Sequence, residues 1–340
     1  MAALPRVTEH VRKLMEKHPE IARQFLPSER LEQEVEVVRP WKGVRETGIP
    51  GTERMYGSEM IVLISTDCPA ECGFCFRRDY LGKPEAFDRK NLDKLIDYLI
   101  EHHDVKEILI TGGEPLTKPD ETAHLASLLL VNGAFRKIRI GTSILRTDPE
   151  SMSQEWIEHL ARYNSNRKFE IAHHFNHPAE FSGKAEMKIR ELHKAGIGQY
   201  VQTVLLKGIN DNETTMRELA HKVRETGMEW YYLLHCMPTC ANLDFRTSVK
   251  KGIDLLESFE AHRETTGRDP PKRYVVASPI GKIYVDSSRI VGKEQDDKGR
   301  NFVWLESRYK PENFPGVDLP ETCHLGKRGF LEVKYLDGKD

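Results

Sequence analysis

From Glu59 onward the sequence alternates short apolar runs with longer amphipathic segments, and this alternation constrains the fold more than any other feature. The apolar runs predict strands at Met60–Ser65, Glu107–Thr111, Lys137–Gly141, Lys168–His173, Tyr200–Leu206 and Trp230–His235. The amphipathic segments predict helices at Leu92–His103, Asp120–Asn132, Ser151–Tyr163, Ala185–Ala195, Glu213–Glu225 and Val249–His262. Strands that alternate with helices predict a parallel sheet with right-handed crossovers.

Six strand–helix units fit an α/β fold of the partial, open (β/α)6 TIM-like barrel type better than a closed eight-fold barrel. We expect this barrel at residues 59–265, after an N-terminal helical extension and connector at 1–58. In the extension, helices are expected between Val7 and Glu36, with a break near Pro27. A C-terminal segment at 266–340 carries short β-like runs at Arg273–Val276 and Lys282–Asp286 in place of helices.

Charge and hydropathy exclude several classes of partner. The 51 basic and 53 acidic side chains leave a formal net charge of −2, which gives no reason to expect nucleic acid or a membrane surface as partner. No apolar run near the N-terminus resembles a signal peptide, and no run is long enough to span a bilayer. We therefore expect a cytoplasmic protein.

Three of the six cysteines, Cys68, Cys72 and Cys75, lie directly after the first expected strand, separated by three and then two residues. On a loop, this spacing can turn three thiolates toward one point. A [4Fe–4S] cube bound by three cysteines keeps one iron open for an exogenous ligand. The alternative is a structural zinc site in a non-catalytic protein. Zinc normally takes four ligands, however, and no fourth cysteine or histidine lies at short spacing.

The cysteine spacing, with Phe74 just before the third cysteine, resembles the signature of the radical S-adenosylmethionine (SAM) superfamily. The stretch Thr111–Pro115, at the end of the second expected strand, resembles the GGE motif of that superfamily, which contacts the amino group of SAM. The resemblance implies that SAM chelates the open iron and is cleaved to a 5′-deoxyadenosyl radical. The residues it assigns to SAM are Gly112, Gly113, Glu114 and Pro115.

Stretches between about Tyr56 and Phe314 resemble a narrower group, the lysine 2,3-aminomutase family. They are Cys75–Arg78, His174–Pro178, Gln202–Asp211, Phe245–Thr247, Lys250–Gly252 and Arg300–Phe302. This family uses the cluster, SAM and pyridoxal 5′-phosphate (PLP) to move an amino group between adjacent carbons. The resemblance implies an amino acid 2,3-aminomutase, an isomerase, on an open six-stranded parallel barrel.

The lysine that binds PLP in this family follows a glycine-rich turn beyond a late β-segment. The matching stretch is Val275–Val285, which assigns Lys282 to the Schiff base with PLP. Here the run of glycines is reduced to Gly281. A lysine after a single glycine is also common in surface hairpins, so the sequence keeps that alternative open.

The resemblance implies further roles around the cofactors. Arg77 matches the position that pairs with the substrate carboxylate, a task that suits a planar guanidinium. Tyr56 matches a tyrosine near the PLP ring, with a core tyrosine as the alternative. His174 and Gln202 match polar positions that line the pocket for SAM and PLP, although a buried structural histidine competes with this interpretation of His174.

Two departures from the family concern the substrate. Lysine-specific members hold the distal ammonium group with two aspartates, whose places are taken here by Met237 and Ala277. A buried ammonium group without a carboxylate would be unfavourable by several kcal/mol, so we expect a substrate other than lysine. A PLP-independent radical decarboxylase, dehydratase or epimerase of a specialised metabolite is the alternative. The family further implies an electron donor such as flavodoxin or ferredoxin, and a homo-oligomer.

Overall fold

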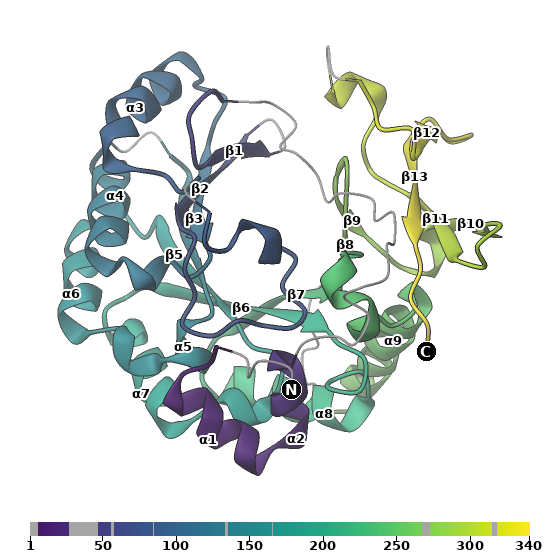
Figure 1. Cartoon of the computed structure of the whole chain (residues 1–340), viewed down its shortest axis with the longest axis horizontal. Helices are drawn as coiled ribbons and strands as arrows, with labels where there is room; N and C mark the ends of the chain where they lie inside the picture. The colour runs from purple at the N-terminus through teal and green to yellow at the C-terminus, as the bar shows by residue number, and fades with distance from the viewer. Residues whose placement is uncertain are drawn as a thin grey trace.

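A computed structural model describes residues 6–26, 47–55, 58–83, 85–132, 135–164, 166–266, 273–314 and 318–340. Within these residues the main sheet has nine strands, which pair in sequence order from β1 to β9. Strands β2 to β8 are parallel, whereas β1 and β9 pair antiparallel at the two edges. The sheet curls into an open half-barrel with the long helices on its outer side (Figure 1), which confirms the expected fold class.

The predicted strands and helices are present, with ends shifted by a few residues. The strands are β1 (Thr52–Met55), β2 (Glu59–Ser65), β3 (Glu107–Gly112), β4 (Lys137–Thr142), β5 (Phe169–His174), β6 (Gly198–Leu205), β7 (Glu229–His235), β8 (Tyr274–Ser278) and β9 (Gly281–Tyr284). The outer helices are α3 (Leu92–Glu101), α4 (Pro119–Asn132), α6 (Gln154–Tyr163), α7 (Gly183–Lys194), α8 (Glu213–Glu225) and α9 (Val249–Thr266). A short helix, α5 (Ile144–Thr147), directly follows β4.

Alternation along the strands separates the two faces of the sheet. On β3, Ile108 and Ile110 are buried in the core between the sheet and the helices, while Leu109 and Thr111 lie on the opposite, inner face. The inner face of β2 is also apolar, because Ile61 and Leu63 form a separate small cluster with Leu109 and Tyr80. The outer face therefore supplies most of the stabilising core, and the inner face carries only a small apolar cluster.

The N-terminal extension contains two helices, α1 (Glu9–Lys17) and α2 (Pro19–Phe25). Helix α2 ends just before Pro27, in agreement with the expected break, but a second break at His18 was not predicted. It arises because Pro19 starts α2 at a position where a backbone N–H is not needed. Residues 27–46 lie outside the described part of the chain. Apolar contacts of Val11, Ile21 and Phe25 with Ala70 pack the extension against the cysteine loop.

Strands β8 and β9 extend the main sheet beyond residue 265, and β1 extends it before residue 59. The chain then forms a separate antiparallel sheet in the order β10-β11-β13-β12. Its strands are β10 (Ile290–Gln295), β11 (Asn301–Glu306), β12 (Cys323–Leu325) and β13 (Leu331–Leu336). Across the described residues, no helix has the combination of length and apolar character that a membrane crossing requires.

Candidate active site

The three clustered cysteines lie on the loop after β2 as free thiols. Burial raises the pKa of Cys75 to about 11, and the neighbouring Cys72 thiol adds to this effect. Burial also raises the pKa of Cys68, helped by the Glu114 carboxylate and then by the other two thiols. All three thiols lie on one short loop between Cys68 and Cys75. A thiolate in such a site needs the positive charge of a bound metal.

The GGE motif lies directly against the segment that leads into the cysteine loop. Gly113 N donates to Ser65 O at 2.7 Å, and Glu114 N donates to Asp67 O at 2.6 Å. A Cβ atom on Gly112 would lie 2.2 Å from Ser65 O, and one on Gly113 would lie 2.4 Å from Asp67 O. Gly112 also has a φ of +142°, which favours glycine. The two glycines are therefore required by close contact with the chain itself.

Glu114 is fully buried and connects this motif to the end of β4. Its carboxylate accepts from Thr142 Oγ1 at 2.5 Å, from Ser143 N at 2.8 Å and from Leu116 N at 3.1 Å. Burial raises the pKa of Glu114, while these hydrogen bonds oppose the rise. Both carboxylate oxygens thus accept hydrogen bonds from the chain, so Glu114 fixes the loop after β3 to the end of β4. A direct contact with SAM stays a prediction.

His174 and Gln202 lie on neighbouring strands in matching register. Ile171 on β5 and Val201 on β6 belong to the outer core, so alternation puts His174 and Gln202 on the inner face. The His174 ring makes a T-shaped contact with Phe74 at 5.7 Å and lies 3.0 Å from Asn176 Oδ1. Burial, followed by the nearby Arg146, lowers the pKa of His174 to about 3. The imidazole is therefore neutral at physiological pH.

Lys282 lies at the other side of the barrel, on the edge strand β9. Its register partner is Ala277 on β8. The neighbours Val276 and Ile283 belong to the outer core, which puts Ala277 and Lys282 on the inner face. Lys282 Nζ lies 5.1 Å from the centre of the Tyr232 ring. The hairpin is thus part of the main sheet, at its edge, and the assignment of Lys282 to PLP stays a prediction.

The turn before Lys282 accounts for the one glycine that remains of the glycine run. Gly281 has a φ of +127°, a conformation that side-chain-bearing residues rarely adopt. Ile280, in the same turn, is buried. A single glycine is therefore sufficient to bring the chain around so that Lys282 lies on the inner face.

Arg77 is paired in the structure with a carboxylate of the chain. Its two terminal nitrogens lie 3.3 and 3.4 Å from the carboxylate oxygens of Glu53 on β1. The guanidinium group also lies 5.0 Å from the centre of the Phe76 ring. A substrate carboxylate would compete with Glu53 for the two terminal nitrogens of Arg77. Tyr56, which we expected near the PLP ring, lies outside the described residues.

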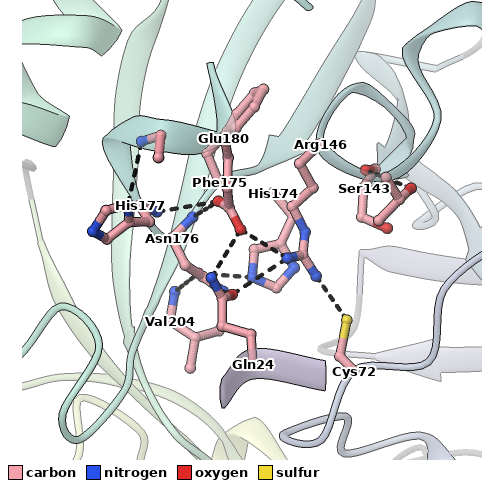
Figure 2. Close-up of polar contacts among 12 residues, drawn as sticks. Gln24, Cys72, Ser143, Arg146, His174, Phe175, Asn176, His177, Glu180 and Val204 are labelled. Atoms are coloured by element: carbon pink, nitrogen blue, oxygen red, sulfur yellow. Dashed lines mark hydrogen bonds and ion pairs between the residues drawn. The ribbon is translucent and has the colours of Figure 1, made fainter. Parts of the chain in front are cut away.

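Arg146 on α5 was not identified from the sequence, although it contacts a candidate cluster ligand. Figure 2 shows its guanidinium group between Cys72 and Glu180. Arg146 follows a strand in no recognisable motif, and Cys72 is 74 residues away in the sequence. The only available signal was an arginine in the apolar segment that follows β4, at the end of the sheet where sites occur.

Comparisons with known proteins agree with this geometry. The sequence profile of the Radical SAM superfamily matches residues 62–220. The L-lysine 2,3-aminomutase of Clostridium subterminale is 30% identical over 295 residues, a match that covers 85% of this chain and 69% of that protein. The chain belongs to the lysine 2,3-aminomutase family. It is a radical SAM enzyme, and as such it acts on a small molecule and needs a reductant.

Other members of the family share this level of similarity. The L-lysine 2,3-aminomutase of Methanococcus maripaludis is 29% identical over 309 residues, covering 88% of this chain and 69% of that protein. The glutamate 2,3-aminomutase of Clostridioides difficile is 29% identical over 272 residues, covering 78% and 62%. The chain therefore matches only about two thirds of the length of these radical SAM relatives. Relatives with two different named substrates are equally similar to it.

The cysteine loop fits the iron–sulfur cluster of a radical SAM enzyme. The described residues contain no group of three His, Cys, Asp or Glu side chains that closes around a single metal ion. The three thiols nevertheless influence one another's pKa. Three cysteine thiolates on one short loop are the ligand type of an iron–sulfur cluster that keeps one iron open.

Proposed function

We propose that this enzyme is a PLP-dependent amino acid 2,3-aminomutase whose substrate is not lysine. The observation that carries the proposal is the position of Lys282, on the inner face of the sheet and directly opposite Ala277. The lysine assigned to PLP thus faces the interior of the barrel whose rim carries the three cysteines. The position that a lysine-specific enzyme fills with a carboxylate is its immediate neighbour and carries only a methyl group.

The cofactors are assigned to two sides of the barrel. Cys68, Cys72 and Cys75 would hold the [4Fe–4S] cluster, and SAM would bind beside it. The residues proposed to contact SAM are Gly112, Gly113, Glu114 and Pro115, and His174 and Gln202 are proposed to line the pocket for SAM and PLP. When bound, the cluster and SAM supply a 5′-deoxyadenosyl radical, and PLP supplies a conjugated ring attached to the substrate nitrogen.

The side chains around Lys282 fit PLP in their chemical type. Lys282 offers a primary amine to the aldehyde carbon, and Tyr232 offers an aromatic face 5.1 Å from that amine. The hydroxyl groups of Tyr232 and Tyr284 lie 3.4 Å apart, and Arg273 Nη1 donates to Tyr284 at 3.1 Å. These contacts hold Tyr284 in a fixed orientation on the same strand as the lysine.

Other residues would orient the substrate and protect the radical. Arg77 would exchange its contact with Glu53 for the substrate carboxylate, which a bidentate fork recognises well. The neutral ring of His174 would donate or accept a single hydrogen bond without bringing charge into the pocket. Phe74, packed with Leu206, Ile209 and Phe245, would exclude water from the cluster side.

The proposed substrate selection follows from the lack of a carboxylate at positions 237 and 277. Met237 lies two residues after the end of β7, and Ala277 lies opposite Lys282. Neither side chain can accept a hydrogen bond from a buried ammonium group in the way that a carboxylate does. Binding the distal ammonium of lysine there would be unfavourable by several kcal/mol. An amino acid with an apolar, neutral polar or carboxylate side chain avoids this penalty.

The proposal extends to organisation and partners. We assign residues 1–58 to an N-terminal extension, 59–265 to the barrel and 266–340 to a segment that carries Lys282. Flavodoxin or ferredoxin is proposed as the electron donor, and a homo-oligomer as the assembly. The described free thiols suit a reducing compartment, so we place the enzyme in the cytoplasm.

The test is to trap PLP chemically on the protein. Anaerobically reconstituted protein would be incubated with PLP, reduced with borohydride, digested and analysed by mass spectrometry. We expect the label on the peptide that contains Lys282, and no such label in Lys282→Ala. Lys293→Ala, which changes an exposed lysine on β10, is the matched control and should retain the label. The loaded enzyme should then convert some amino acids, but not lysine, to β-amino acids.

A cluster-containing protein that retains no PLP would contradict the proposal. In that case the PLP-independent alternative, a radical decarboxylase, dehydratase or epimerase, becomes the account to test. The same protein would then be assayed for SAM cleavage in the presence of carboxylated metabolites. Labelling of a lysine other than Lys282 would retain the aminomutase reaction but reject the assigned lysine.

A further inference from the structure

Arg146 is a fully buried charged side chain that contacts the cysteine loop. It is 1% exposed and lies on the short helix α5, directly after β4. Its Nη2 atom donates to Cys72 Sγ at 2.7 Å, and its Nη1 atom donates to Glu180 Oε1 at 2.9 Å (Figure 2). The guanidinium group therefore joins a buried carboxylate to a sulfur that is assigned to the cluster.

The partners of Arg146 are themselves fixed by the chain. Glu180, also 1% exposed, accepts from Asn176 N at 2.6 Å and from His177 N at 3.1 Å. Gln24 on α2 donates to Glu180 Oε1 at 3.0 Å and accepts from Arg146 at 3.3 Å. These bonds hold the carboxylate on one side of the guanidinium group, so its other edge is directed at the sulfur.

Aromatic rings complete the enclosure of the guanidinium group. Its central carbon lies 5.3 Å from the centre of the Phe25 ring and 5.7 Å from that of Phe74. A buried cation is unfavourable unless it is paired and hydrogen-bonded. Here the Glu180 pair and the sulfur contact satisfy both terminal nitrogens. Arg146 and Glu180 together carry no net charge, but the positively charged guanidinium group is the part that contacts Cys72.

We propose that Arg146 is a positioning residue that raises the reduction potential of the iron–sulfur cluster through a charged hydrogen bond to the Cys72 thiolate. The proposal rests on the proposed function, because it requires a cluster on Cys72. Reduction adds one negative charge to the cluster, part of which resides on the cysteine sulfurs. A charged donor at a sulfur stabilises the reduced form, and hydrogen bonds to the sulfurs are a recognised control of cluster potential.

The residues that carry this role come from three distant parts of the chain. Arg146 follows β4, Glu180 follows β5, and Gln24 belongs to the N-terminal extension. The extension also contacts the cysteine loop directly, since Gly73 N donates to Gln24 O at 2.7 Å. The N-terminal helices thus contribute to the environment of the cluster as well as to the packing of the fold.

The test is a redox titration of the reconstituted cluster, followed by electron paramagnetic resonance. In Arg146→Met we expect the equilibrium constant for one-electron reduction to fall about tenfold, which is a shift of 59 mV to more negative potential. Arg146→Lys restores the charge and should recover part of the shift. Arg78→Met is the matched control, because Arg78 donates to the backbone oxygen of Cys72 and not to its sulfur. It should shift the potential much less.

The single variant leaves the Glu180 carboxylate buried without its cation, which can prevent folding. The double variant Arg146→Met/Glu180→Gln removes both charges and keeps the net charge of the pair unchanged. It should still show the negative shift, because the hydrogen bond to sulfur is lost. Equal potentials in the wild type and both Arg146 variants would overturn the proposal. A wild type that binds no iron would instead contradict the cluster assignment itself, so the two failures are distinguishable.

Discussion

The cluster side and the Lys282 side of the half-barrel hold their functional groups in different ways. On the cluster side, backbone contacts of Gly112 and Gly113 and the buried hydrogen bonds of Glu114 and Arg146 fix the loops to one another. On the other side, Lys282 is placed by the pairing of β9 with β8, by a hydrogen bond from the Tyr309 hydroxyl to its backbone oxygen at 3.4 Å, and by the Tyr232 ring.

This difference separates two parts of the chemistry. Removing the Glu114 or Arg146 side chain leaves buried polar groups without a partner, so the effect spreads to the neighbouring loops. The side chains of Ala277 and Met237 form no hydrogen bond with the described residues, so their replacement breaks none. We propose that radical formation belongs to the cluster side and substrate choice to the Lys282 side.

The largest expected effect is that of Cys72→Ala. We expect this variant to lose the cluster and all turnover, because two cysteines cannot replace the three-thiolate site. Iron analysis after anaerobic reconstitution measures the loss. Cys323→Ala, in the separate C-terminal sheet, is the control and should retain full iron content. Full activity of Cys72→Ala would disprove the cluster assignment.

Lys282→Ala should separate the two sides of the barrel. We expect it to abolish amino-group migration while leaving the iron content and reductive SAM cleavage near the wild-type level. Chromatographic detection of 5′-deoxyadenosine and absorbance of bound PLP measure the two sides independently. Unchanged PLP loading would show that another lysine binds the cofactor, and loss of iron would show that the two sides are coupled.

Gly113→Ala should disturb the cluster side without removing a ligand. Its new Cβ atom would lie 2.4 Å from Asp67 O, so the backbone must shift. We expect a loss of about 1–3 kcal/mol in the free energy of unfolding, with weaker iron binding. Gly183→Ala is the control, because no atom lies within 4 Å of its added Cβ. Equal melting temperatures for both variants would contradict the tight contact between the two loops.

The smallest effect is expected for changes at Met237 and Ala277, on the Lys282 side of the half-barrel. The double variant Met237→Asp/Ala277→Asp should increase kcat/KM for lysine by about tenfold or more, since each carboxylate can pair with the distal ammonium group. Steady-state kinetics with lysine and with the best substrate of the wild type measure this change. Rapid turnover of lysine by the unchanged enzyme would contradict the proposed substrate selection.

The sequence predicted the barrel well, because regular alternation of strands and helices is a local signal. It missed β8 as a seventh parallel strand, since Tyr274–Ser278 is a short run that no helical unit follows. The break at His18 was also missed, although Pro19 carries its signal.

The site was predicted less evenly. The cysteines, the GGE turn and Lys282 were assigned from motifs that are compact in sequence, and their roles stay predictions. Arg146, Glu180 and Gln24 have no such pattern, and their contact depends on the folded arrangement of three separate elements. The assignment of the GGE glycines to SAM stays a prediction, and their close contact with Ser65 and Asp67 was visible only in three dimensions.

The most direct test of the central claim is an electron paramagnetic resonance spectrum of the anaerobically reconstituted and reduced protein, recorded with and without SAM. We expect the signal of a reduced [4Fe–4S] cluster that changes when SAM binds to the iron without a cysteine ligand. An absent iron signal, or a cluster signal that SAM leaves unchanged, would contradict the assignment of Cys68, Cys72 and Cys75 to a radical SAM centre.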